Sequence, residues 1–267
     1  MTSLCISPSS THLLVFTSSN SLRIYDLSAT SEVRRNSVPA IRHIARAHDA
    51  PVHVSTVDPS SSYVASGSAD GVVKVWDLQR GYVTHVFKGH GGVVSALAFY
   101  HRPGREIGEI ATFRLFTGSV DNRIRVFDLA APRGPHGSKP NIVLEGHVSV
   151  PRGIAVSGDG KWLVSGGRDA VALIWDLTGG KGKRGFAAPV KTIPILERVE
   201  ALGILATDVE SGTTYPSLKF YTGGEHGTIK IWDAWKGTVL ASMNPPHMHV
   251  ESDEEAVEEQ PEILNVL

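Results

Sequence analysis

Short apolar stretches separated by polar turns recur along this chain. After His48, the alternating stretch PVHVSTV is followed by the turn DPSSS and the strand-like stretches YVASGS and VVKVWDL. Alternation with a period of two predicts half-buried β-strands, and clusters of Asp, Pro, Ser and Gly predict the turns between them. The same order returns at VVSALAF, FRLFTGS and IRVFDL, and again at RGIAVSGDG, WLVSGG and ALIWDL. The pattern therefore predicts an all-β chain built from repeated groups of strands.

An aromatic residue followed by Asp closes the last strand of each group. The five pairs are Tyr25-Asp26, Trp76-Asp77, Phe127-Asp128, Trp175-Asp176 and Trp232-Asp233, and successive pairs lie 51, 51, 48 and 57 residues apart. Repeats a little over 40 residues long that end in WD and carry an upstream GH are typical of β-propeller blades. Such four-stranded sheets bury their faces by stacking on one another. The sequence thus predicts a WD-repeat β-propeller with five recognisable blades.

Polar residues also recur at constant positions within the groups. In WD-repeat propellers, which this chain resembles, the GH histidine bridges a turn Asp and a strand Ser or Thr, which in turn reaches the Trp indole. The resemblance implies two complete sets, His48, Ser66, Asp70 and Trp76, and His147, Ser165, Asp169 and Trp175. A third set has His90, Thr117 and Asp121 but Phe127 in place of Trp. The outer copies are weaker, with Ser19 and His226 at the Asp position.

A Ser, a His and an Asp in proximity also suggest a hydrolase triad. An enzyme needs one site with one geometry, whereas these residues repeat at the same phase in successive blades. The chain contains no GxSxG, HExxH, GxxxxGK[ST] or GxGxxG motif. We therefore expect a structural role for the sets, with no catalytic residue, no cofactor and no small-molecule substrate. His247 and His249 alone make no convincing metal site, so no metal is expected.

Charge is unevenly distributed in a chain whose net charge is −1. Residues 251–262 hold seven acidic and no basic residues, which is typical of a disordered, solvated segment, or alternatively of a docking element for a basic partner. Basic, Gly- and Pro-rich segments occur at residues 101–105, 132–139 and 179–185. They predict solvated loops, with contact to an RNA backbone as the alternative.

A single cysteine, Cys5, and the lack of a long apolar run favour a reducing compartment and no membrane contact.

The patterns of strands and charge divide the chain into three parts. Residues 1–244 are predicted to form a partial WD-repeat propeller, residues 245–262 an acidic, disordered loop or tail, and residues 263–267 the first strand of a further blade. We expect an open ring, and hence a fragment of a larger propeller, because the chain opens directly on an inner strand.

Two segments narrow the family. Residues 47–99 and the run PVKTIPILERVEALGIL at residues 189–205 resemble the first propeller of the transducin-beta-like subunit of the UtpB module, part of the small-subunit processome. The resemblance implies a non-catalytic nucleolar scaffold in ribosome biogenesis and rRNA processing, which contacts neighbouring WD-repeat subunits and pre-ribosomal RNA. The alternative is a substrate receptor of a cullin-type ubiquitin ligase. Such receptors resemble one another in a WDxR motif, but here the Arg position holds Gln79, Ala130 and Thr178.

One pair of arginines is a candidate partner-facing site. Arg168 precedes the turn Asp of its blade, and Arg152 follows His147 by five residues. Turns of a rigid repeat scaffold present recognition groups, so two guanidinium groups on one blade would suit a carboxylate or phosphate of a neighbouring component. The equally simple alternative is a pair of solvated arginines.

Overall fold

The computed structural model describes residues 1–28, 39–102, 112–130, 139–178, 185–208 and 217–244. These residues form β-strands and turns without an α-helix, and none of them belongs to a helix that could cross a membrane. The predicted all-β class is confirmed. The acidic segment 245–262 and the strand expected at residues 263–267 lie outside the described residues.

The described strands form five sheets, which we number as blades 1 to 5 in chain order. Blade 1 holds β1 (Ser3–Ile6), β2 (His12–Phe16), β3 (Leu22–Asp26) and β4 (Arg42–Ile44), and blade 2 holds β5 (Val52–Val57), β6 (Tyr63–Ser68), β7 (Val73–Asp77) and β8 (Val83–Phe87). Blade 3 holds β9 (Val94–Arg102), β10 (Thr112–Ser119), β11 (Arg123–Asp128), β12 (Ile142–Glu145) and β16 (Gly185–Ala187). Blade 4 holds β13 (Pro151–Val156), β14 (Trp162–Gly167), β15 (Val171–Asp176) and β17 (Lys191–Pro194), and blade 5 holds β18 (Val199–Asp208), β19 (Ser217–Gly224), β20 (Ile229–Asp233) and β21 (Thr238–Met243).

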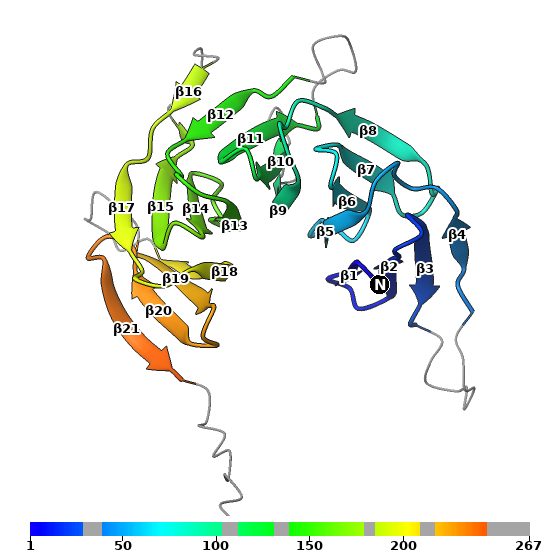
Figure 1. Ribbon diagram of the computed structural model, residues 1–267. Coiled ribbons are helices and arrows are strands. Elements are labelled where there is room, and N and C mark those ends of the chain that lie inside the picture. The colour runs from blue at the N-terminus through cyan, green and yellow to red at the C-terminus, as the bar shows by residue number, and fades with distance from the viewer. Residues whose placement is uncertain (29–38, 103–111, 131–138, 179–184, 209–216, 245–267) are drawn as a thin grey trace, which may run out of the picture.

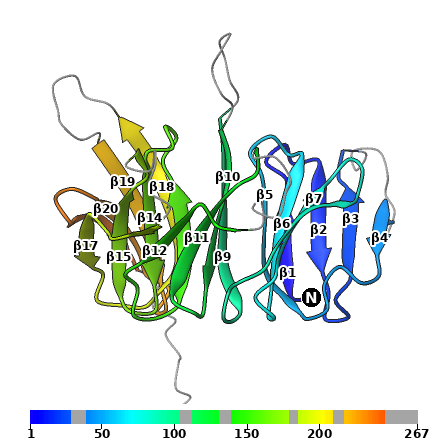
Figure 2. The same cartoon turned by 90° about the horizontal axis from the view of Figure 1, so that it is seen from above.

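The blades stand side by side in an arc (Figure 1). In each blade the first strand lies on the inner side of the arc and successive antiparallel strands lie further out. Figure 2 shows that the strands run between the two rims of the arc, so the connecting turns gather on two opposite faces. Blades 1 and 5 lie at the two ends and leave the ring open, as predicted.

Blade 3 differs from the other described sheets because a fifth strand joins it. β16 comes from the segment between β15 and β17 of blade 4 and pairs parallel with β12, the outermost antiparallel strand of blade 3. A strand added to an edge satisfies backbone groups that would otherwise face solvent. The connection therefore ties blade 4 to blade 3 by main-chain hydrogen bonds as well as by packing.

The hydrophobic core is divided among the four blade junctions. One cluster of buried side chains lies between each pair of neighbouring blades, for example Phe16 and Trp76 between blades 1 and 2, and Phe87 and Phe127 between blades 2 and 3. Two further clusters join blades 3 and 4 and blades 4 and 5. Each sheet thus buries its apolar faces only against its neighbours, as expected of a repeat array.

A glycine in the second strand of a blade allows close approach of the next blade. A Cβ built on Gly67 would lie 2.5 Å from a side-chain carbon of Val94 in β9. Since real Cβ contacts are longer than this, any larger residue would push blade 3 away from blade 2. A Cβ on Gly166 or Gly118 would likewise lie 2.7 or 3.1 Å from a side chain of the next blade, so these glycines are required by inter-blade packing.

The face of blade 5 that points away from blade 4 is exposed. Val73, Ile124 and Ala172 stand three residues before the aromatic of their blades, and each is 0% exposed because the next blade covers it. Ile229 occupies the same position in blade 5 and is 43% exposed, and its strand partner Met243 is 53% exposed. The described residues offer no further sheet to cover this face. It is a contiguous apolar surface of the kind that promotes association.

We predict that the 267-residue chain self-associates through this face. Ile229→Lys combined with Met243→Lys should lower the sedimentation-average mass at micromolar concentration, because charges on an exposed sheet face oppose pairing. Val148→Lys, which changes an 82% exposed turn residue, is the control and should leave the mass unchanged. A wild-type chain that sediments as a monomer at all concentrations would contradict the prediction.

Candidate protein-interaction site

Blade 4 contains a complete polar network. His147 Nε2 lies 2.8 Å from the Ser165 hydroxyl, which also accepts a 2.8 Å hydrogen bond from the Trp175 indole N–H. On the other side of the ring, His147 Nδ1 lies 2.8 Å from Asp169, and Asp169 also accepts the backbone N–H of Val148. Burial alone would raise the pKa of Asp169, but the hydrogen bond and charge of His147 outweigh it and lower the pKa. The network joins the turn, the inner loop and two strands.

Blade 3 lacks the indole donor and adds an arginine at the Asp end of the set. His90 contacts Thr117 at 2.7 Å and Asp121 at 3.2 Å, while Phe127 supplies no N–H. Arg125, which is buried, donates to Asp121 at 2.6 Å. Burial would raise the pKa of Asp121, but hydrogen bonds from His90, Gly91 and Arg125 hold it far below its usual range. Sequence reasoning missed Arg125, although a cation two residues before the aromatic is visible in NRIRVFD.

Blade 2 does not form the complete set that the sequence predicts. His48 Nε2 contacts Ser66 at 2.8 Å and the Trp76 indole donates to Ser66 at 2.9 Å, but Asp70 makes no contact with His48. Asp70 is exposed and accepts the backbone N–H of Val72 instead, which closes a local turn. His48 Nδ1 is consequently buried without a hydrogen-bond partner among the described residues. The expectation that Asp70 joins this set was wrong, because its carboxylate stays in the local turn. The turn bond alone does not account for this, since Asp121 accepts the equivalent N–H of Arg123 and still contacts His90.

The environment of His48 favours the neutral imidazole. Burial lowers its pKa to about 4, and the charge of Lys74 contributes in the same direction. Lys74 stands two residues before Trp76, where it donates to the Ala47 carbonyl at 2.7 Å. An uncharged ring with one unsatisfied nitrogen can be tolerated here, whereas a charged ring beside a lysine cannot.

Blade 5 uses a glutamate instead of a GH histidine. The Trp232 indole donates to Thr222 at 2.9 Å, which repeats the indole–hydroxyl contact of blade 4. The buried Glu197 accepts a 2.7 Å hydrogen bond from Thr228 and forms a 2.7 Å ion pair with Lys230. Burial would raise the pKa of Glu197, but Lys230 and Thr228 lower it. Glu197 lies in the stretch ILERVEAL, which no blade consensus requires. Its bonds to Thr228 and Lys230 give this glutamate a structural role that the sequence alone did not reveal.

Arg152 and Arg168 do come together, but on a carboxylate of the same chain. The Nε atoms of Arg152 and Arg168 lie 2.7 and 3.0 Å from the two oxygens of Glu200. Arg152 is in β13 and Arg168 in the turn after β14, whereas Glu200 is in β18, so the clamp joins blades 4 and 5. Arg198 and Glu225, 3.3 Å apart, form a second ion pair on blade 5. The expectation of two free guanidinium groups on one blade is corrected, because each already binds Glu200.

The clamp nevertheless remains at the surface. The side chains of Arg152 and Arg168 are 37% and 49% exposed, and that of Glu200 is 31% exposed. A guanidinium has five N–H donors, so a carboxylate that occupies one edge leaves others facing outward. The described part of this face therefore presents arginine donors that are held in fixed positions.

The other candidate sites lie wholly or largely outside the residues that the structure describes. The basic segments at residues 101–105, 132–139 and 179–185 fall wholly or largely outside the described residues, as do His247 and His249. Within the described ranges, no group of three or more His, Cys, Asp or Glu side chains is arranged to hold a metal ion.

Three segments of the chain match a family of known proteins. Residues 41–77, 81–128 and 138–176 match the WD domain, G-beta repeat, and each match ends on the Asp of an aromatic-Asp pair. Together with the five blades, these matches show that the chain is a WD-repeat protein of the β-propeller type, with an open arrangement of blades.

Within that class the chain is similar to transducin beta-like protein 3, as predicted. It is 36% identical to the Bos taurus protein over 192 residues and 37% identical to the Homo sapiens protein over 202 residues. These matches cover 71% and 74% of this chain and 22% of each relative. The U3 small nucleolar RNA-associated protein 13 of Saccharomyces cerevisiae is 28% identical over 92% of this chain and 27% of its own length. The chain thus spans about a quarter of the length of these three relatives.

We predict that Asp169 and Asp70 differ in their contribution to stability. Asp169→Ala leaves His147 Nδ1 and the Val148 N–H without their acceptor and should lower the free energy of unfolding by about 1–3 kcal/mol. Asp70→Ala should cost clearly less, because this exposed side chain makes one local turn bond. Urea denaturation of the two variants measures the difference. Equal losses would mean that Asp70 contacts His48 in solution.

A pH series tests the buried His48. The pKa of His48 is about 4 in the folded chain, whereas a histidine in the unfolded chain has a pKa of about 6.5, so between these values the unfolded state binds a proton that the folded state excludes. Stability should therefore fall as pH is lowered from about 6.5 to 4, by on the order of 2–3 kcal/mol.

His48→Gln should make the free energy of unfolding less dependent on pH in this window. A residual slope is expected, because burial also lowers the pKa of His90. The exposed His43 provides the control, and His43→Gln should leave the slope as it is in the wild type. An unchanged slope in His48→Gln would contradict the account.

Proposed function

We propose that this chain is part of a non-catalytic WD-repeat scaffold that acts in ribosome biogenesis. In this proposal it works in the nucleolus, within the small-subunit processome, where it binds other WD-repeat subunits of a UtpB-like module and supports pre-ribosomal RNA processing. The observation that carries the proposal is the similarity to transducin beta-like protein 3 and to U3 small nucleolar RNA-associated protein 13.

The physical character of the blades supports a scaffold. The recurrent His, Ser and Asp side chains bond to one another and to backbone groups within their blades, as in the set of His147, Ser165 and Asp169. A hydrolase triad would need one such set beside an oxyanion site and a substrate pocket. The blades instead present turns and ion pairs on a rigid array, which is suited to binding other macromolecules.

The alternative proposal, a substrate receptor of a cullin-type ubiquitin ligase, is less well supported. The position two residues after the Asp of each WD-type pair holds Gln79, Ala130 or Thr178 rather than Arg. The relatives named above point instead to a nucleolar RNA-associated assembly. The two proposals differ in the proteins that they expect to co-purify.

We further propose that the face carrying the clamp of Arg152, Arg168 and Glu200 is the partner-binding face, and that the basic segments contact pre-ribosomal RNA. The clamp supports this because its arginines are held in place yet exposed at 37% and 49%. Ordered arginines lose little conformational entropy when they bind a carboxylate or phosphate. The basic segments supply Lys and Arg on Gly-rich stretches, which suit phosphate contacts without base recognition.

We predict that affinity purification of the tagged full-length protein recovers other WD-repeat processome subunits together with U3 small nucleolar RNA. Mass spectrometry and RNA blotting measure the two classes of partner. Recovery of a cullin and its adaptor without these components would replace the scaffold proposal by the ligase alternative.

A charge-swapped variant separates the role of the clamp in binding from its role in folding. Arg152→Glu with Arg168→Glu would crowd three carboxylates, so Glu200→Arg is added to restore opposite charges across the junction of blades 4 and 5. The triple variant should unfold at nearly the wild-type temperature but recover less partner. Wild-type recovery at normal stability would exclude this face from the interface.

A further inference from the structure

Cations from outer strands bind the turn of the following blade at two junctions. Arg42 of β4 in blade 1 donates to the backbone carbonyls of Arg80 at 2.8 Å and Gln79 at 3.2 Å, in the turn between β7 and β8 of blade 2. Lys191 of β17 in blade 4 donates in the same way to the carbonyl of Trp235, in the turn between β20 and β21 of blade 5. The slot between neighbouring outer strands thus accepts a guanidinium or an ammonium group.

The pairing of strands identifies the equivalent position in blade 2. Arg42 pairs with Ile24 and Lys191 pairs with Ile174, and each of these isoleucines directly precedes the aromatic of its blade. In blade 2 the residue before Trp76 is Val75, and its partner is His85. At the junction of blades 2 and 3 a histidine therefore stands where the junctions of blades 1 and 2 and of blades 4 and 5 have a long cationic side chain. The equivalent position at the junction of blades 3 and 4 holds Ile142, the partner of Val126.

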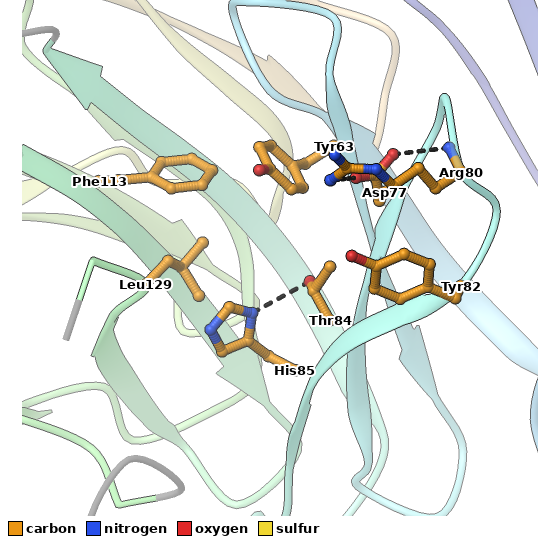
Figure 3. Close-up of a pocket in the computed structure, with 8 residues that line it drawn as sticks. All are labelled: Tyr63, Asp77, Arg80, Tyr82, Thr84, His85, Phe113 and Leu129. Carbon is orange, nitrogen blue, oxygen red and sulfur yellow. Dashed lines mark hydrogen bonds and ion pairs between the residues drawn. The ribbon is translucent and has the colours of Figure 1, made fainter. Parts of the chain in front are cut away.

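A pocket of about 180 Å³ lies at this position (Figure 3). Figure 3 shows Phe113 and Leu129 of blade 3 facing Tyr63, Tyr82 and Thr84 of blade 2 across it. His85 lines the pocket as well, with its ring bonded to Thr84 at 3.0 Å and stacked on Phe87. Since small-molecule sites usually measure roughly 300–1,000 Å³, the pocket has room for one side chain and not for a cofactor.

The lining suits a cation. Tyr63, Tyr82 and Phe113 provide aromatic rings, whose faces attract ammonium and guanidinium groups. Asp77 adds a carboxylate on a side chain that is 10% exposed. Its Oδ2 lies 3.5 Å from the nearest guanidinium nitrogen of Arg80, which is a long contact.

Among the described residues that line the pocket, Arg80 is the one arginine or lysine. Its side chain is 69% exposed, so it lies at the rim and can turn into solvent without losing buried contacts. The backbone N–H of Arg80 donates to Asp77 Oδ1 at 2.8 Å, and this hydrogen bond does not depend on the position of the guanidinium. An incoming cation can therefore replace Arg80 beside Asp77.

We propose that this pocket, defined by Tyr63, Asp77, Tyr82, His85 and Phe113, binds an arginine or lysine side chain of a partner protein. The partner supplies in trans a cation comparable to the ones that Arg42 and Lys191 supply in cis at two of the three other junctions. The pocket lies where β6 begins and β7 ends, apart from the clamp of Arg152, Arg168 and Glu200. The proposal of a cation site does not depend on the proposed function in ribosome biogenesis.

The test uses N-acetyl-arginine amide as the probe, with the neutral isostere N-acetyl-citrulline amide and the anionic N-acetyl-glutamate amide as comparisons. Titration of the whole chain is followed by NMR of fluorotyrosine introduced at all tyrosines, with Tyr82→Phe used to assign one signal of the pocket. The arginine probe should bind in the millimolar range and shift the signals of Tyr63 and Tyr82. Citrulline should bind at least about tenfold more weakly, the equivalent of roughly 1.4 kcal/mol.

Two variants make the test specific to the pocket. His85→Arg places a long cation comparable to Arg42 and Lys191 in the slot and should abolish probe binding without lowering the melting temperature. Val86→Arg adds the same charge at the next, 40% exposed position of β8 and should leave binding unchanged. Arg80→Ala should bind the arginine probe at least as tightly as the wild type.

Several results would overturn the proposal. The first is a failure of the arginine probe to bind at concentrations up to tens of millimolar. The others are equal affinity for the arginine and citrulline probes, and binding that is retained in His85→Arg. Preferential binding of the glutamate probe, lost in Arg80→Ala, would show that the pocket selects an anion instead.

Discussion

The stacking of one sheet on the next is the constraint on which the rest of this structure depends. Each blade is too thin to bury its own apolar side chains, so the core is split into four clusters, one at each junction. Gly67 shows how tightly the junctions are packed, because a single added carbon would collide with Val94. An open stack has two end faces, and the one formed by Ile229 and Met243 is exposed. Such an architecture stabilises its middle blades more than its ends.

The sequence predicts the blades well because their main signals are local. The aromatic-Asp pairs and the alternation between them depend on residues that are close in the chain, and the structure confirms the five sheets that they predict. Contacts within a blade were only partly predictable. Asp169 reaches His147, whereas Asp70 accepts the N–H of Val72 two residues away instead. Asp121 makes both kinds of contact, so a local turn bond does not by itself exclude the histidine. Identical residue types at identical spacing therefore do not guarantee the same network.

Contacts between blades could not be predicted, because the residues that make them carry no repeating signal. Glu200 lies far along the chain from Arg152, and only the stacking of blades 4 and 5 brings them together. The equivalence of Arg42, Lys191 and His85 likewise follows from strand register and not from a shared motif. These junction residues are where the surface of the array differs from blade to blade. A scaffold of similar blades gains its specificity at such positions.

The central claim is that the chain is an open stack in which each blade is held by its neighbours alone. Hydrogen–deuterium exchange, resolved by strand, tests it most directly, since protection reports the free energy of local opening. The account predicts the slowest exchange in the inner and middle strands of blades 2 to 4, such as β6 and β14, with intermediate protection in blade 1. At a concentration at which the chain is monomeric, it predicts the fastest exchange among strands in β20 and β21 at the exposed face of blade 5. Uniform protection across all five blades in the monomeric chain would contradict the open stack and indicate a closed ring.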